Sequence, residues 1–287
     1  MNFKKKQVTL LISGLFILLN ISSITAGSAS FSFHTNQFIQ KLEQLEYNSR
    51  EIKDTINVSY NTISTYPEKT ALILNPSEYL YGKLHCQLII NNLHTNGYQV
   101  TYLSNEAVDL SFIKTNLAAE IVYINTHAGY FDIDGDNISE TVVIATGELW
   151  TEETPQKYQF EYENDMIVEG SVGDKSFIAF TPALIEYYYD TGDFPDSLIY
   201  MATCFASYDD SMAQVFLDKG ASAYMGWNQN TVFWTNSLTS IKAFRLFLYG
   251  YTVEQVCNLI RSGGIINFFL QSKLTYYGDG THKMLIL

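Results

Sequence analysis

The sequence predicts an α/β fold built around a mostly parallel β-sheet, with its reactive side chains at one edge of that sheet. Short apolar runs rich in β-branched residues alternate with amphipathic segments of helical length, a pattern typical of parallel sheets covered by helices. Two of these runs stop abruptly at a chemically capable side chain, residues 121–126 at His127 and residues 198–203 at Cys204. Because parallel strands present their carboxyl ends at a common edge, we expect this imidazole and this thiol to meet there.

The first 26 residues have the features of an export signal. Lys4, Lys5 and Lys6 form a basic start, residues 8–19 form an apolar core, and small residues follow around Ala26. We expect this signal peptide (1–26) to be removed, which predicts a secreted or extracytoplasmic protein. The competing interpretation is an uncleaved membrane anchor, because the apolar stretch approaches the roughly 18–20 residues that span a bilayer.

Charge and length restrict the class of protein. About 260 residues remain after such a signal, enough for one large α/β domain or for one domain with a small appendage. Removing the three signal lysines from the 17 basic residues leaves 14 against 30 acidic residues, a formal net charge of −16. Such a surface repels nucleic acid and anionic membranes and attracts calcium and basic peptides. We therefore expect no nucleic-acid partner, and membrane contact only if the signal stays uncleaved.

The elements before His127 follow a βαβαβ order. Residues 27–68 precede them as an N-terminal appendage, interpreted as a helix packed on the core, with a pro-segment or a stalk as alternatives. The expected strands are 71–74, 98–103 and 121–126, and the expected helices between them are 81–96 and 110–117. Consecutive parallel strands of this kind are joined by right-handed crossovers, so these elements form one sheet.

The interval between His127 and Cys204 predicts a β-rich insertion (131–180) followed by a crossover helix. Its expected antiparallel strands are 141–145, 158–163, 167–171 and 176–180, with a turn at Gly173 and Asp174. Thr181 and Pro182 then begin a helix over 183–189. After Cys204 we expect a helix over 211–219, a strand over 221–226, and helices over 241–249 and 253–260.

The three cysteines differ in context. An odd number of cysteines in an exported chain leaves at least one free thiol, so we expect no disulfide framework. Cys86 and Cys257 lie in apolar helical patterns, where cysteine serves as a small core residue. Only Cys204 follows a strand end. The alternatives are a buried core thiol for Cys204 and a hydrogen-bonded rim residue for His127.

The order of these features resembles the caspase-hemoglobinase fold of cysteine peptidases, which includes gingipains, clostripain, legumain and caspases. The resemblance is carried by a strand leading to His127 and Gly129, a crossover helix, a strand leading to Cys204, and then a helix and the segment 220–227. Residues 277–280 also look like the terminal turn of gingipain-type domains. The resemblance implies a caspase-like three-layer sandwich and a peptidase domain over 69–287.

The resemblance also implies an activity, that of a cysteine endopeptidase acting on peptide or protein substrates without an organic cofactor. Cys204 would be the nucleophile, His127 the general acid that protonates the leaving amine, and the backbone N–H groups of Gly129 and Cys204 the oxyanion donors. An oxyanion needs donors about 2.7–3.1 Å away, and glycine lets the backbone approach that closely. The alternative is a catalytically inactive domain of the same fold that serves as a calcium-binding interaction module at the cell surface.

The sequence departs from the relatives' pattern near both candidate catalytic residues. Ala128 separates His127 from Gly129, whereas relatives commonly have His-Gly directly. Clostripain-like enzymes carry an acidic residue shortly before the nucleophile to bind Arg or Lys, and here Met201 and Ala202 occupy those positions.

The substrate pocket is therefore the least determined part of the site. Asp209 and Asp210 are the nearest acidic substitutes, although capping of the helix that follows explains them equally well. Trp227 either walls the pocket or fills the edge of the core. We expect at most a moderate preference for Arg or Lys at the cleaved position.

Residues 132–140 predict a calcium-binding loop. Asp132, Asp134, Asp136 and Glu140 supply carboxylates, and the Ile138 carbonyl is expected as a further ligand. Calcium takes six to eight oxygen ligands, and unpaired carboxylates this close repel one another without a cation. A solvated acidic turn is the alternative.

Overall fold

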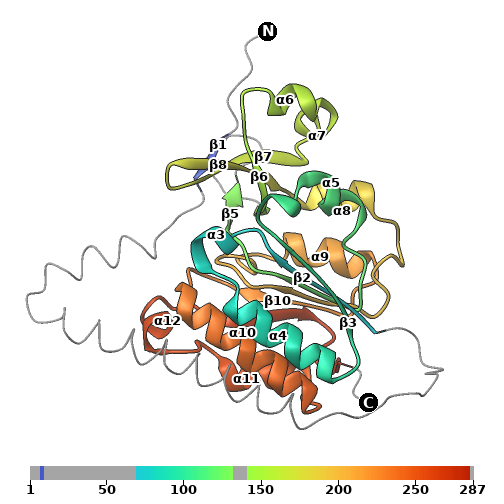
Figure 1. The fold of residues 1–287 in the computed structure, drawn as a ribbon, viewed down its shortest axis with the longest axis vertical. Coiled ribbons are helices and arrows are strands. Elements are labelled where there is room, and N and C mark those ends of the chain that lie inside the picture. The colour runs from blue at the N-terminus through green and yellow to red at the C-terminus, as the bar shows by residue number, and fades with distance from the viewer. Residues whose placement is uncertain (1–6, 10–68, 132–140, 285–287) are drawn as a thin grey trace, which may run out of the picture. The chain divides into compact units, whose positions relative to one another are not determined.

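Two β-sheets organise the part of the chain that the structure describes (Figure 1). The structure is a computed structural model and describes residues 7–9, 69–131 and 141–284. The six-stranded sheet has the order β11-β10-β9-β4-β2-β3, and its strands pair in parallel except for the antiparallel pair of β10 and β11. Its strands are β2 (Thr70–Asn75), β3 (Gln99–Ser104), β4 (Ile121–Ile124), β9 (Leu198–Met201), β10 (Ala223–Trp227) and β11 (Leu274–Gly278).

Helices cover both faces of this sheet, as Figure 1 shows. One face carries α4 (Leu84–Thr95), α10 (Phe233–Leu248) and α11 (Val253–Ile260), and the other carries α5 (Leu110–Thr115), α8 (Pro182–Tyr188) and α9 (Ser211–Asp218). Shorter elements are α3 (Glu78–Tyr81), η1 (Asn105–Ala107), α6 (Thr154–Lys157), α7 (Gln159–Glu163) and α12 (Ile265–Phe269). The expected α/β class with a mostly parallel central sheet is confirmed.

The central strands are apolar throughout because both of their faces are buried. Leu74, Ile124 and Met201 belong to the core that α5, α8 and α9 cover. Tyr123 and Tyr200, the neighbours in sequence of Ile124 and Met201, pack on Phe244 of α10. Alternate residues of a strand point to opposite faces, so a strand between two helical layers reads as a continuous hydrophobic run.

Four of the five strands in the second sheet come from the interval between His127 and Cys204, where a β-rich insertion was expected. The order of this sheet is β1-β7-β8-β6-β5, with β1 (Gln7–Thr9), β5 (Ala128–Phe131), β6 (Thr141–Leu149), β7 (Ile167–Val172) and β8 (Lys175–Phe180). The pairs β5–β6, β6–β8 and β7–β8 are antiparallel, and β1 lies parallel to β7. Because β5 begins directly after His127, the insertion starts at the edge where the candidate site lies.

The strand expected over 158–163 is wrong, because residues 159–163 form the helix α7 and Tyr158 is its N-cap residue. Tyr158 and Tyr162 are both buried and lie four residues apart, a spacing that places them on one face of a helix. The Gln159 side chain donates to Glu163 at 2.9 Å across the same turn. The alternation of aromatic residues at 158, 160 and 162 had suggested a strand, but their burial follows helical spacing.

Two expected helices also have different limits. The helix expected over 81–96 is divided at Gly82, whose φ of 70° and ψ of −179° do not continue a helix. The helix expected over 241–249 begins earlier, at Phe233. The sequence did not reveal this start because the first turns bury polar side chains, which leave no hydrophobic pattern. The sequence also missed β11, since residues 274–278 read only as the approach to a turn.

The N-terminal predictions fall largely on residues outside the described part of the chain. Of the signal peptide (1–26) only Gln7–Thr9 are described, and the appendage (27–68) lies outside altogether. Within the described ranges, no helix has both the length and the apolarity needed to cross a membrane.

His85 on α4 predicts a loss of stability in acid. The side chain is 2% exposed, and burial lowers its pKa from 6.5 to about 4. Between those pH values the unfolded chain binds a proton that the folded chain does not, so the free energy of unfolding falls as the pH falls from 6.5 towards 4. We expect His85→Leu to reduce this loss by about 2–3 kcal/mol between pH 7 and 4.5, measured by urea denaturation. An unchanged pH dependence in the variant would contradict the assignment.

Candidate active site

His127 and Cys204 follow the carboxyl ends of two neighbouring parallel strands. β4 pairs with β9, and Ile124 lies opposite Met201. Ala202 N donates to Ile124 O at 2.8 Å, so the two chains still run side by side just beyond the sheet. Each candidate residue comes three positions after its strand ends. The two strand ends therefore share the edge that the sequence predicted.

Tyr81, the last residue of α3, contacts His127. Its Oη lies 3.1 Å from His127 Nε2, and the two ring centroids are 5.3 Å apart. The Tyr81 ring also stacks on Phe233, with a centroid distance of 4.4 Å and planes 12° apart. Burial raises the pKa of Tyr81, and a negative charge on Cys204 would raise it further. No motif in the sequence marked Tyr81, because it reaches the site only through the break at Gly82.

Cys204 is held by the loop that follows β10. Its Sγ accepts a hydrogen bond from Thr231 N at 3.2 Å and donates one to Thr231 O at 3.4 Å. The next residue, Phe205, has a φ of 55° and donates its N–H to Gln229 O at 3.3 Å. A left-handed conformation is costly for a non-glycine residue and persists only where the surroundings impose it. The loop thus determines both the turn and the direction of the thiol.

Burial favours the uncharged form of both candidate catalytic groups. It lowers the pKa of His127 from 6.5 to about 4. It also raises the pKa of the Cys204 thiol, an effect that hydrogen bonds from the backbone partly offset. Both residues keep part of their surface exposed. In the free protein near neutral pH, the pair is therefore a thiol and a neutral imidazole, and not a thiolate with an imidazolium.

The ladder of β5 and β6 indicates an oxyanion donor other than Gly129. Ala145 N donates to His127 O at 2.9 Å, and Gly129 lies opposite Val143. Mutually bonded pairs alternate along an antiparallel ladder, so Gly129 and Val143 form the next such pair and the Gly129 N–H is directed at β6. Because Ala128 and Ile144 form the alternate, non-bonded pair of this ladder, the N–H of Ala128 is directed away from β6. Ala128, together with Cys204, is the candidate donor in this geometry.

A chain of buried side-chain amides lies at the ends of the central strands. Trp227 Nε1 donates to Asn236 Oδ1 at 2.8 Å, Asn236 Nδ2 donates to Asn125 Oδ1 at 3.1 Å, and Asn125 Nδ2 donates to Asn75 Oδ1 at 2.8 Å. Asn75 Nδ2 then donates to Gly82 O at 3.1 Å, and Asn236 Nδ2 also donates to Ala202 O at 2.8 Å. These linked amides connect Gly82, the residue after Tyr81, with Ala202, which lies two positions before Cys204.

Of the residues proposed for the substrate pocket, one lies in the core and two lie at the start of α9. Trp227 is fully buried and its indole N–H is used within the amide chain, which fits the second of its two alternatives, a residue that fills the edge of the core. Asp209 Oδ1 accepts from Ser211 N at 2.9 Å at the start of α9, and Asp210 is the N-cap residue of that helix. Both carboxylates contribute to raising the pKa of Tyr277 on β11, after its burial.

The candidate calcium ligands cannot be placed. Asp132, Asp134, Asp136, Ile138 and Glu140 all lie outside the described residues. Elsewhere, within the described ranges, no group of three or more His, Cys, Asp or Glu side chains is arranged to hold a metal ion. The calcium loop stays a prediction from the sequence. All three cysteines are free, as expected.

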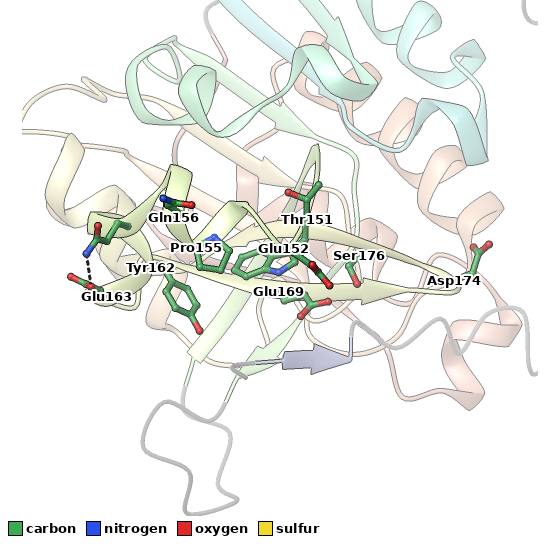
Figure 2. A pocket seen from close by; sticks show the side chains of 11 residues that line it. Thr151, Glu152, Pro155, Gln156, Tyr162, Glu163, Glu169, Asp174 and Ser176 are labelled. Atoms are coloured by element: carbon green, nitrogen blue, oxygen red, sulfur yellow. Dashed lines mark hydrogen bonds between the residues drawn. The ribbon is translucent and has the colours of Figure 1, made fainter. Parts of the chain in front are cut away.

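A groove of about 940 Å³ lies on the insertion (Figure 2). It combines the aromatic rings of Trp150 and Tyr162 with four carboxylates, those of Glu152, Glu163, Glu169 and Asp174. Its lining residues include neither His127 nor Cys204, so the groove is separate from the candidate active site.

No protein-family model matches the chain, and no curated protein matches it. The function is therefore argued from the chemistry and geometry of the site.

The amide chain predicts a large stability effect at Asn236. Replacing it by Leu leaves Trp227 Nε1, Asn125 Oδ1 and Ala202 O without their partner, and each buried unpaired group costs roughly 1–3 kcal/mol. We expect Asn236→Leu to lower the free energy of unfolding by about 3–5 kcal/mol, measured by denaturant titration. Asn258→Leu, at an exposed position of α11, is the matched control and should stay within about 0.5 kcal/mol of the parent protein. Equal effects of the two substitutions on the free energy of unfolding would contradict the stabilising role of the linked amides.

The uncharged pair predicts the pH dependence of thiol alkylation. The thiolate is the reactive form, so with a raised pKa the rate at Cys204 should increase about tenfold per pH unit through the neutral range. We expect this increase with iodoacetamide, with the modified residue identified by mass spectrometry. A rate plateau between pH 5 and 7 would indicate a preformed ion pair and overturn the assignment.

Proposed function

We propose that this protein is an exported cysteine endopeptidase with a caspase-like three-layer sandwich, in which Cys204 is the nucleophile and His127 transfers protons. The observation that supports the proposal is that a loop-held thiol and an imidazole each follow, three positions later, the carboxyl end of two adjacent parallel strands, with Tyr81 within hydrogen-bond distance of the imidazole. Nucleophilic catalysis needs such a pair, in which the base is itself oriented by a third group.

The first half of the reaction follows from the uncharged state of the pair. Cys204 Sγ attacks the peptide carbonyl carbon while its proton passes to His127, and the carbonyl π electrons move to the oxygen. The N–H groups of Ala128 and Cys204 hold the oxyanion that results. When the tetrahedral intermediate collapses, the C–N bond breaks, the leaving amine takes the proton from His127, and a thioester remains on Cys204.

Hydrolysis of the thioester completes the cycle. A water molecule gives one proton to His127 as its oxygen attacks the thioester carbonyl, and the same two N–H groups hold the second oxyanion. Expulsion of the sulfur then releases the carboxylic acid, and the proton on His127 returns to Cys204. Tyr81 and Thr231 contribute by holding the imidazole and the thiol in position.

Substitution of Cys204 tests the nucleophile. We expect Cys204→Ala to lower the hydrolysis of a mixed peptide library by roughly 10³-fold or more, because the covalent step has no other thiol at this edge. Cys257→Ala is the matched control, since Cys257 is a buried core thiol on α11, and it should keep activity within a few-fold. A thiol-reactive peptidyl probe should label Cys204 in the parent protein.

Two results would contradict the proposal. Undiminished hydrolysis by folded Cys204→Ala protein would assign the reaction to another nucleophile. A parent protein that neither cleaves the library nor accepts the probe would favour the interaction module instead.

A further inference from the structure

Buried polar atoms without hydrogen-bond partners occur in the turn that carries Cys204 and in the loop that holds its thiol. Across the described residues the buried side-chain atoms without a partner are Tyr123 Oη, Thr203 Oγ1, Ser207 Oγ, Asn230 Oδ1 and Ser237 Oγ. Three of these five belong to the turn at residues 203–207 or to the facing loop at residues 228–232. An unpaired buried polar atom costs free energy, so it calls for an explanation, and a substrate that supplies the missing partner is one.

Asn230 is the best placed of these residues to meet a substrate. The residue before it, Gln229, accepts the Phe205 N–H at 3.3 Å, and the residue after it, Thr231, holds Cys204 Sγ through both its N–H and its carbonyl. Consecutive Cα atoms are about 3.8 Å apart, so Asn230 lies within one residue of both contacts. Asn230 as a whole is half-buried, while its Oδ1 is enclosed and lacks a hydrogen-bond partner.

The unpaired atom defines the chemistry of the ligand. Oδ1 of an amide accepts hydrogen bonds and carries no charge. Thr203, which directly precedes the nucleophile and is 2% exposed, adds a hydroxyl that can donate or accept. A ligand that fits this polar, uncharged environment presents an N–H or O–H donor.

We infer that Asn230 is a specificity-determining residue, whose Oδ1 accepts a hydrogen bond from an uncharged donor on the substrate residue bound beside Cys204. This inference rests on the proposed peptidase. The favoured substrates are peptides with Asn, Gln, Ser or Thr at that position.

A cationic side chain fits this position less well. Burying Lys or Arg requires a paired carboxylate, because an uncompensated buried charge is expensive. The carboxylates of Asp209 and Asp210 lie at the start of α9 beside Tyr277, and Asp209 is already bonded to Ser211 N. The residues in contact with Cys204 and Phe205 in this loop, Thr231 and Gln229, are uncharged. A site built from unpaired neutral groups discriminates against ligands that leave those groups unpaired.

The test replaces the amide by an isosteric carboxylate. Cleavage of a peptide library varied at each position around the scissile bond is compared for the parent protein and Asn230→Asp. We expect the ratio of kcat/KM for Lys or Arg over Asn or Gln to rise at least tenfold at one position. The matched control is Asn228→Asp, which adds the same charge to the same loop. Asn228 Oδ1 accepts Lys273 N at 2.8 Å, a bond that a carboxylate keeps, so this variant should leave the ratio unchanged.

The donor could also be a main-chain N–H of the substrate, and a second set of peptides separates the two sources. Peptides N-methylated at single positions remove one main-chain donor each. If Asn230 binds a main-chain N–H, Asn230→Asp changes kcat/KM equally for all side chains, and methylation of one position abolishes that change. A shift confined to one side-chain position identifies the side-chain donor. Asn230→Asp protein that behaves like Asn228→Asp in both sets would overturn the inference.

Binding to protein without the nucleophile separates this inference from the proposed activity. Fluorescence anisotropy measures the Kd of labelled library peptides for Cys204→Ala and for Cys204→Ala with Asn230→Asp. Selective binding of uncharged donors that the second substitution reverses supports the inference even if the parent protein hydrolyses nothing. Hydrolysis by the parent protein with no effect of Asn230→Asp on rate or Kd would leave the peptidase standing and reject the role of Asn230. Absence of both binding and hydrolysis would reject both.

Discussion

The candidate site depends on a chain of buried amides at the ends of the central strands. The chain starts at the Trp227 indole N–H, a donor, and ends at the Gly82 carbonyl, and each of Asn236, Asn125 and Asn75 between them both donates and accepts a hydrogen bond. In a low-dielectric interior such a chain is costly when broken and rigid when complete. It determines where α3 ends, and therefore where Tyr81 meets His127. Through the Ala202 carbonyl, it also determines where the chain leaves β9 towards Cys204.

Burial at this edge of the sheet also determines the charge states of the two candidate catalytic groups. It favours the neutral imidazole and the protonated thiol, so a proton has to move during the attack on substrate instead of beforehand. Contacts to Tyr81 and Thr231 compensate by holding both groups in place. Thr231 positions the thiol through two hydrogen bonds, and its neighbour Asn230 has a buried Oδ1 without a hydrogen-bond partner.

The insertion adds a second surface to the edge that carries the chemistry. Its first strand starts directly after His127, so the β5–β6 ladder decides which N–H groups are used within the sheet and which face outward. Its far part carries the acidic and aromatic groove around Trp150, which shares no lining residue with the candidate catalytic pair. The four carboxylates of that groove account for part of the protein's negative charge.

The sequence by itself determined the parallel sheet, its helical layers and the edge where His127 and Cys204 emerge, because buried strands leave continuous apolar runs and the reactive residues directly follow them. It did not determine the secondary structure of residues 158–163, because aromatic residues alternate there as in a strand while their burial follows the spacing of a helix. It also missed the polar start of α10 and the roles of Tyr81 and Asn236. These residues have no local signature, since their roles come from partners that are distant in sequence, such as Asn125 and Asn236, 111 residues apart. Only the tertiary structure brings such residues together, because hydrogen bonding between separate elements follows from packing and not from the periodicity of either element.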